Sequence, residues 1–405
     1  MTNANQNLEF NRTIAAPVAA VYRAFTHSTI LREWLCDAAQ AIAKPGGRLY
    51  LAWHDGYYAM GEFTELEQDH RVAFTWLGKG EPGPTQIGVS LTAADGHTAL
   101  ALTHSGFGEG ETWQSLAAMM RQGWEYGLEN LQSILETGHD LRITRRPMMG
   151  INLDEFNAEI AAKLGAPVSE GIRLSGALAG MGAAAAGLQK DDVIVGLAGH
   201  EVKDWPTLVT ALQSRRAGDP VEVVFYRGPE KRTVTMTLSP RPLPTVPATA
   251  GELAEALRQE YQRYDEALTQ FLAEVSEAEA EYRPAEGEWS TKETLAHLIG
   301  GERETHCWIA DLINGDERWS DTFSNPTNVP ARVQATVRVY GTAAALLAEL
   351  RRNEQETVAM IAVLPADFVA GKSSYWRLGM NVLQQASHVT DHLEQMRAAV
   401  RAARS

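Results

Sequence analysis

Three histidines in the C-terminal third of the chain have the residue type and spacing to bind a metal ion. His388 and His392 are four residues apart, so on a helix both imidazoles lie on one side, one turn apart. His297 offers a third nitrogen from an earlier helical segment. The histidine pair lies about 100° from the centre of an apolar stripe. This edge position favours a site in a cleft at the bundle mouth. The stripe consists of Val382, Ala386, Val389, Leu393 and Met396.

Three neutral imidazoles would leave coordination positions open for water or a thiolate. Nitrogen ligands are compatible with Zn, Ni or Fe, and the sequence does not choose between these divalent transition metals. A histidine pair at this spacing also occurs in helices without any metal, so a structural role is the alternative. His306 lies on the opposite face of its helix from His297, Glu293 is explained by a helix cap, and Glu304 is about two turns away.

The three histidines lie in two of four helical patterns, which together predict an all-α four-helix bundle. The second pattern opens with Ser290-Thr291-Lys292-Glu293, which is a capping box. Connections of short to medium length between long amphipathic helices are typical of a bundle. The patterns span residues 252–278, 290–313, 336–364 and 378–403.

Residues 252–400 resemble the DinB/YfiT-like family, through EGEWSTKETLAHLIGGERE around His297 and QASHVTDHLEQM around His388 and His392. All three positions of that family's histidine triad are filled. Characterised relatives include metal-dependent thiol S-transferases and an isomerase. The resemblance therefore implies a metal that lowers the pKa of a thiol. No catalytic residue can be named, because neither a general acid nor a general base stands out.

The first segment predicts a curved antiparallel sheet covered by one long helix. Leu8, Phe10 and Ile14 alternate with polar residues, as in a strand, and Pro17 opens a helix that precedes a second short helix starting at Ser28. Residues 39–107 then form short apolar runs separated by turn residues, which is typical of a meander. An amphipathic helix from Thr112 to about Gly138 must pack across that sheet.

This segment resembles the activator-of-Hsp90-ATPase-like branch of the helix-grip (START-like, SRPBCC) superfamily over residues 8–136. The matching stretches are APVAAVYRAFTHSTILREWL, GEFTELEQDHRVAFTW and LTHSGFGEGETWQSL. The resemblance implies a cavity between sheet and helix for a small apolar ligand. Plain core packing is the alternative for each aromatic residue that could line it. A link to the Hsp90 chaperone rests on the family name alone. The candidate lining residues are Trp34, Trp53, Tyr58, Phe63, Trp76 and Trp124.

The middle segment resembles the PDZ domains of HtrA-type proteases, with the carboxylate-binding loop first. The matching stretches are RPMMGINL, AAAAGLQKDDVIVGLAGHEVKDWPTLVTAL and DPVEVVFYRGPEKRTVTMTL. The resemblance implies that backbone N–H groups of Met149, Gly150 and Ile151 bind the C-terminus of a protein or extended peptide. Leu208 and Leu212 of the helix 205–212 would receive an apolar side chain.

Two features depart from the PDZ pattern. The usual glycine before the turn aspartate is replaced in Lys190-Asp191-Asp192, and an acidic, Ala-rich insertion occupies residues 154–163. A groove closed by that insertion is the alternative to an open one. No protease domain accompanies the segment.

Composition limits the classes of partner and compartment. The 405 residues carry a formal net charge of −15, which disfavours nucleic acid. The two cysteines, Cys36 and Cys307, exclude a disulfide framework. The stretch 174–188 is too short and too weakly apolar to span a membrane, and residues 1–6 lack the apolar region of a secretory signal. We therefore expect a cytoplasmic protein.

The whole chain is predicted to be a multidomain α+β protein. Its expected parts are a helix-grip domain (1–138), a PDZ β-barrel-like domain (146–240), a Pro-rich linker (241–251) and an all-α bundle (252–403). Two of the three domains favour a binding or regulatory protein. A metal-dependent thiol S-transferase acting through the bundle is the alternative, so whether the chain is an enzyme stays open.

Overall fold

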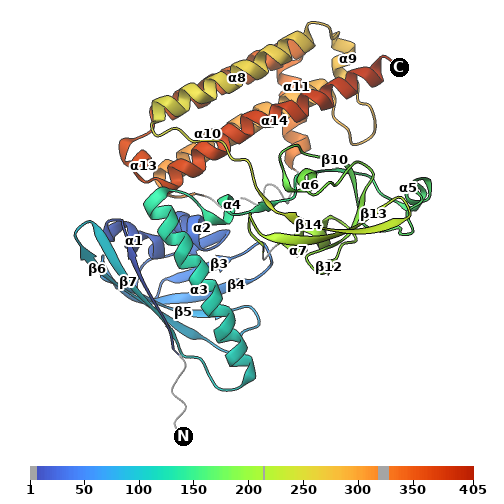
Figure 1. Ribbon diagram of the computed structural model, residues 1–405. Helices are drawn as coiled ribbons and strands as arrows, with labels where there is room; N and C mark the ends of the chain where they lie inside the picture. Colours follow the sequence, from blue (N-terminus) through green and yellow to red (C-terminus); the bar gives the residue numbers. More distant parts are fainter. Residues whose placement is uncertain (1–6, 213–214, 318–327) are drawn as a thin grey trace. The chain divides into compact units, whose positions relative to one another are not determined.

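The computed structural model describes residues 7–212, 215–317 and 328–405, without the side chains of Asn328 and of residues 386–388. The chain divides into two compact units, which are described separately (Figure 1). Unit 1 combines Met1–Asp140 with Pro244–Ser405, and unit 2 is Leu141–Leu243.

The N-terminal part of unit 1 is a seven-stranded antiparallel sheet in the order β1-β7-β6-β5-β4-β3-β2. Long strands follow one another as a meander, and β1 closes the far edge by pairing with β7. The mixed architecture and the antiparallel sheet confirm the predicted fold class. The strands are β1 (Leu8–Ile14), β2 (Ala38–Ala41), β3 (Arg48–Ala52), β4 (Tyr58–Glu67), β5 (Arg71–Gly78), β6 (Thr85–Ala94) and β7 (His97–Ser105).

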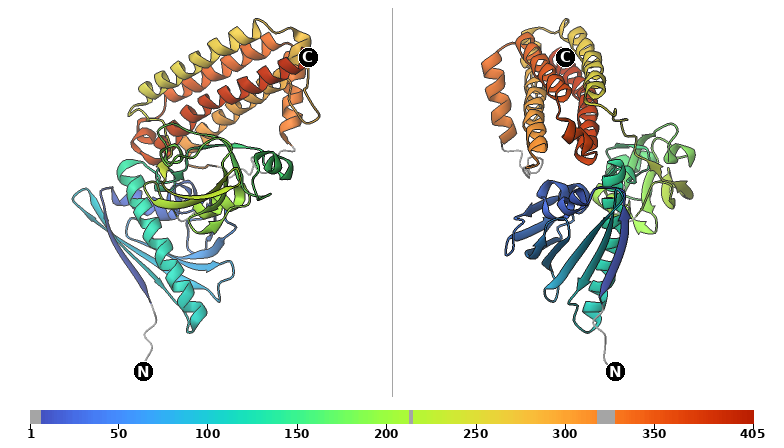
Figure 2. Two further views of the ribbon diagram at one scale, coloured as in Figure 1. Left: turned by 45° about the vertical axis from the view of Figure 1, so that its right-hand side comes forward. Right: turned by 90° about the vertical axis from the view of Figure 1, so that its left-hand side faces the viewer.

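Three helices accompany this sheet: α1 (Val18–Thr26), α2 (Ser28–Trp34) and α3 (Glu111–Thr137). Helix α3 lies across one face of the sheet (Figures 1 and 2). Its buried side chains join those of the strands in one apolar core, because both elements have one apolar face that must leave water. The helix ends where Gly138 adopts φ 84°, a conformation that glycine takes without strain.

Unit 2 contains a six-stranded sheet in which five strands follow the order β14-β13-β11-β10-β9, while β12 pairs with β11. Strands β15 and β8 form a separate pair. Its strands are β8 (Pro147–Met148), β9 (Ile151–Asp154), β10 (Ile172–Ala177), β11 (Val193–Leu197), β12 (His200–Glu201), β13 (Pro220–Arg227), β14 (Glu230–Thr237) and β15 (Ser239–Pro240). Its helices are α4 (Leu141–Thr144), α5 (Ala158–Leu164), α6 (Gly182–Ala185) and α7 (Trp205–Leu212).

The C-terminal part of unit 1 is helical. Its long helices are α8 (Ala250–Leu272), α10 (Thr291–Asn314), α12 (Ala343–Ala362) and α14 (Ser373–Ala403), and they share one apolar core. The described residues of this region also form the shorter helices α9 (Glu277–Glu281), α11 (Asn328–Tyr340) and α13 (Ala366–Ala370). The capping box expected at the start of α10 is present, since Ser290 and Glu293 bond each other's backbone N–H groups.

The third helical pattern, expected over residues 336–364, is divided in the structure. Helix α11 ends at Tyr340, Gly341 takes φ 73°, and Thr342 caps α12 through a bond from the Ala345 N–H. A glycine in the left-handed region followed by a capping threonine is a stop and start signal. The first pattern likewise ends at Leu272, before the separate helix α9.

The C-terminal end of the stretch predicted as a Pro-rich linker packs on the bundle. Val246 contacts the bundle core, and the Tyr375 hydroxyl donates a hydrogen bond of 2.9 Å to the Pro247 carbonyl. Among the described residues, no helix combines the length and the apolar character needed to cross a membrane.

Candidate functional sites

The structure brings two of the three predicted metal ligands together. The rings of His297 on α10 and His392 on α14 have centroids 5.0 Å apart. Their interplanar angle is 69°. Ring centres about 5 Å apart occur in two imidazoles that share a tetrahedral ion, and also in an edge-to-face aromatic contact. The side chain of His388 lies outside the described residues.

Neighbouring groups orient both rings. Trp289 packs against His297 with a centroid distance of 4.7 Å, and Nδ1 of His392 lies 3.1 Å from Oε1 of Gln395. If Nδ1 of His392 carries the proton, it donates to Gln395 and directs the ring's lone pair to Nε2. Within the described part of the chain, which excludes the His388 side chain, no three His, Cys, Asp or Glu side chains form a metal-binding group.

The residues that the sequence argument set aside have other contacts. His306 Nε2 lies 2.8 Å from Thr357 Oγ1 and faces α12. Glu293 caps α10 and also pairs with Arg283, while Glu304 forms an ion pair with Arg332. These contacts give His306, Glu293 and Glu304 partners other than His297 and His392.

The bundle contains a buried polar cluster that the sequence did not predict. The Tyr261 hydroxyl donates to both oxygens of Glu302 at 3.0 Å, and Thr357 Oγ1 donates to Glu302 at 2.6 Å. Burial, Asp265 and Glu302 together raise the pKa of Glu354 to about 8. Acidic residues at helical spacing look like a solvated face, and only the packing of α8, α10 and α12 shows that Glu302 and Glu354 are buried.

Four of the six aromatic candidates belong to the buried core of the N-terminal domain: Trp34, Phe63, Trp76 and Trp124. The ring of Trp76 lies 5.9 Å from that of Trp124 and 6.2 Å from that of Trp53. The half-buried Trp53 extends this group toward Tyr57, whose ring is 5.2 Å away.

The sixth aromatic candidate, Tyr58, does not join this group. Its neighbour Ala59 is buried, so the alternation along β4 turns Tyr58 to the other face with the exposed Met60. There its ring lies 6.2 Å from that of Tyr50, which is 41% exposed.

Two polar groups lie among these aromatics. His104 is fully buried, and its two ring nitrogens contact Trp124 Nε1 at 3.0 Å and Thr85 Oγ1 at 2.7 Å. Near Trp53, the Tyr57 hydroxyl donates to Glu81 at 2.5 Å, and burial together with this carboxylate raises the pKa of Tyr57. His104 lies in the stretch LTHSGFGEGETWQSL, but the sequence did not single out either His104 or the Tyr57–Glu81 pair.

In unit 2, the predicted carboxylate-binding loop leads into the edge strand β9. Gly150 has φ 78°, and a Cβ there would lie 2.3 Å from Cβ of Met181. Met149 is 3% exposed, whereas Ile151 is half-buried. Of the strands that the structure describes, β10 alone pairs with β9, and an edge strand of this kind is where PDZ domains add a peptide strand.

The helix α7 supplies the two leucines named from the sequence, with different exposure. Leu208 is 1% exposed and part of the core of unit 2, while Leu212 is half-buried against that core. The acidic insertion contains the short helix α5, which Asn157 caps through a bond from the Ile160 N–H.

The departure at Asp191 has a local explanation. Asp191 takes φ 68° where the family pattern has glycine, and its carboxylate accepts two hydrogen bonds from Arg173. The next residue, Asp192, is completely buried and forms a two-point ion pair with Arg227, with both N–O distances at 2.7 Å. The turn is therefore held by charge pairs.

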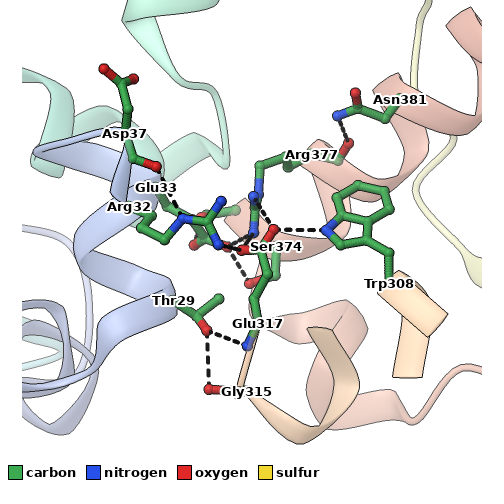
Figure 3. A network of polar contacts seen from close by, with 11 residues as sticks. Thr29, Arg32, Glu33, Asp37, Trp308, Gly315, Glu317, Ser374, Arg377 and Asn381 are labelled. Carbon is green, nitrogen blue, oxygen red and sulfur yellow. Dashed lines mark hydrogen bonds and ion pairs between the residues drawn. The ribbon is translucent and has the colours of Figure 1, made fainter. Parts of the chain in front are cut away.

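Within unit 1, a network of buried charges joins α2 to the end of α10 and the start of α14 (Figure 3). Arg377 pairs with Glu317 at 2.6 Å and with Glu33 at 3.4 Å, and Arg32 pairs with Glu317 at 3.1 Å. Ser374 Oγ donates to Glu33 at 2.5 Å, and Ser373 Oγ bonds the same carboxylate.

The pKa values of the two carboxyl groups in this network, Glu33 and Glu317, are shifted in opposite directions. Burial raises the pKa of Glu33 more than Arg377 and the two serine hydroxyls lower it. Burial also acts on Glu317, but Arg377 and Arg32 hold the pKa of that carboxyl below its usual value.

Three regions of the chain each match a known family. Residues 15–136 match the family described as activator of Hsp90 ATPase homolog 1-like protein, residues 147–238 match the PDZ domain, and residues 256–396 match the DinB superfamily. None of the curated proteins compared with the chain matches it.

Similar solved structures cover the N-terminal third. A protein from Mesorhizobium loti is 22% identical over 32% of this chain and 96% of its own, with a TM-score of 0.30. An HSP90 activator from Plasmodium falciparum is 25% identical over 32% of this chain and 95% of its own, with a TM-score of 0.28. The Aha1 dimer from Colwellia psychrerythraea is 21% identical over 32% of this chain and 96% of its own, with a TM-score of 0.29.

The three family matches confirm the three resemblances drawn from the sequence. The chain thus consists of an activator-of-Hsp90-ATPase-like domain, a PDZ domain and a DinB-superfamily domain, in that order.

Proposed function

We propose that this chain is a multidomain binding and regulatory protein whose helical domain binds one divalent transition metal through His297, His388 and His392. The observation that carries the proposal is the 5.0 Å separation of the His297 and His392 rings across two helices. The one-turn spacing of His388 and His392 adds the third ligand. Zn, Ni and Fe all suit nitrogen ligands.

A metal held by three imidazoles would supply a Lewis acid with open coordination positions. Neighbouring residues of the chain would orient His297 and His392 for metal binding. Trp289 packs against His297 and would restrict the orientation of that ring. In the tautomer with the proton on Nδ1, His392 would donate a hydrogen bond to Gln395 Oε1 and present the lone pair of Nε2 to the metal.

The PDZ domain supports binding of a peptide or protein partner. We propose that the C-terminus of the partner occupies the loop of Met149, Gly150 and Ile151 and extends along β9. The left-handed Gly150 and the unpaired outer edge of β9 support this placement.

For the N-terminal domain we propose a small apolar ligand beside Trp53 and Trp76. The hydrogen-bonded pair of Tyr57 and Glu81 lies next to these rings and would bind a polar end of such a ligand. Hydrogen bonds to this pair would make the site selective for ligands with a polar end, which apolar contacts alone would not do.

The test is metal content by ICP-MS on protein purified without a histidine tag. About one equivalent of a transition metal is expected in the wild type, and the His388→Ala, His392→Ala double variant should lose it. His306→Gln is the matched control on α10, because His306 bonds Thr357 and stands apart from the pair. Absence of metal in the wild type, even after reconstitution, would overturn the metal-binding proposal.

A further inference from the structure

Helix α2 contacts two domains of unit 1 with different residues. Trp34 is 1% exposed within the N-terminal core, where its indole nitrogen donates to the Ala24 carbonyl at 2.8 Å. Glu33, one residue earlier, is bonded to the start of α14. Thr29 Oγ1 donates to the Gly315 carbonyl at 3.0 Å and accepts from the Glu317 N–H at 3.1 Å. The same short helix therefore packs in the N-terminal core and forms polar contacts with the helical domain.

The charges at this contact are largely removed from water. The exposed fractions of the side chains are 2% for Glu33, 5% for Glu317 and 17% for Arg377. Two positive and two negative groups, including Arg32, compensate each other (Figure 3). Removing one of these groups by substitution would leave a buried charge without its counterion while the contact stays closed, and such a loss is strongly unfavourable.

A second contact lies beside this network, between the end of α3 and the start of α14. Lys372 Nζ donates to the Glu136 carbonyl at 2.7 Å. The rings of His139 and Trp376 have centroids 5.3 Å apart. The start of α14 is thus held by both α2 and the C-terminal end of α3, the two helices that carry Trp34 and Trp124.

We propose that the Hsp90-activator-like and DinB-like domains form one cooperative folding unit, joined through α2 and Arg377, with the PDZ domain inserted as a separate unit. The chain leaves the joint unit after Asp140 and returns at Pro244. Ligand binding to one part of a cooperative unit stabilises the whole unit. A metal bound by α14 should therefore stabilise α2, and the ligand proposed beside Trp53 and Trp76 should stabilise the bundle.

Hydrogen exchange followed by mass spectrometry on the full chain tests this coupling. In Arg377→Met, amide exchange should become faster by at least about tenfold in the peptides covering α2 and the first turns of α14. Exchange in β11 of the PDZ domain should not change. Arg397→Met is the matched control on α14, because Arg397 forms an exposed i,i+3 pair with Glu394 and such pairs contribute little.

Glu33→Gln provides a second variant that changes the charge without changing the side-chain size, for use if Arg377→Met fails to fold. It should accelerate exchange in α14 as well as in α2. Acceleration confined to the element that carries the substitution, for both variants, would overturn the proposal. Acceleration in β11 to the same extent would contradict the separate position of the PDZ domain.

A second arm uses Zn²⁺ and rests on the metal site proposed above. Zn²⁺ should slow exchange in α2 of the wild type but not in α2 of Arg377→Met, while α10 and α14 are protected in both. Protection limited to the bundle of the wild type would overturn the coupling and leave the metal site intact. If Zn²⁺ slows exchange in none of these helices, the proposed metal site is wrong. The coupling is then judged from the exchange rates of the wild type and Arg377→Met without metal.

Discussion

The indole nitrogen of Trp124 donates a hydrogen bond of 3.0 Å to Nδ1 of His104. This assigns the proton of the neutral imidazole to Nε2, which donates to Thr85 Oγ1 at 2.7 Å. Both ring nitrogens are satisfied only while the ring is neutral, since a protonated Nδ1 would face the N–H of Trp124. The relationship fixes the charge state of a fully buried histidine.

The His104 side chain should make stability depend on pH. Burial lowers the pKa of His104 to about 4, whereas an unfolded histidine has a pKa of about 6.5. The unfolded chain therefore binds more protons between these values, and stability falls as the pH drops from about 6.5 to 4. The expected loss is up to about 3 kcal/mol.

Urea denaturation at pH 7.5 and pH 4.5, followed by tryptophan fluorescence, measures this loss. His104→Gln should be less stable than the wild type at pH 7.5 but should show a smaller difference between the two pH values. His97→Gln, at an exposed position, is the control. An equal pH difference in wild type and His104→Gln would contradict the assignment.

Glu354 should have the opposite dependence. Its pKa is raised to about 8 by burial, Asp265 and Glu302, so the folded chain binds more protons than the unfolded chain between about 4.5 and 8. Stability falls as the pH rises through that range. Glu354→Gln should unfold at a higher temperature than the wild type at pH 8, by the equivalent of about 2–4 kcal/mol.

At pH 5 this advantage of Glu354→Gln should largely disappear, because the wild-type carboxyl is then protonated. Calorimetry at both pH values gives the comparison, with Glu356→Gln as the exposed control on α12. A gain of the same size at both pH values would refute a titrating Glu354.

Gly150→Ala should abolish peptide binding by the PDZ domain. The added Cβ would lie 2.3 Å from the Met181 Cβ at a position with φ 78°, so the loop must move. Fluorescence anisotropy with a pool of peptides that share an apolar C-terminal residue measures binding. The wild type should bind the free-acid pool and reject the C-terminally amidated pool, since only the former presents a carboxylate. Equal binding of both pools would argue against the loop as the site.

The two aspartates of the PDZ turn should differ in their effect on stability. Asp192→Asn removes one charge of a buried pair with Arg227 and should cost about 3 kcal/mol. Asp191→Gly loses the ion pair with Arg173 but removes a positive-φ aspartate, so it should change stability by less than about 1 kcal/mol. Hydrogen exchange in β10 and β11 reports both. A larger loss of stability in Asp191→Gly than in Asp192→Asn would contradict this prediction.

The sequence alone determined the order of the three domains and most of their elements. Alternating apolar residues in β1, the amphipathic pattern of α3 and the capping box at Ser290 act through neighbours close in sequence. Such local signals predict element type well. The break at Gly341 was also local, and the glycine with its following threonine could have revealed it.

Only the tertiary structure decided which polar residues are buried and which candidates meet. Glu33, Glu302, Glu354 and His104 look solvent-exposed or unremarkable by type, and burial follows from elements far away in the chain. Tyr58 belongs to the same aromatic class as Trp53, yet the side-chain alternation of β4 turns it to the other face. The pairing of His297 with His392, and of Glu33 with Arg377, likewise joins residues whose distance in space no local pattern encodes.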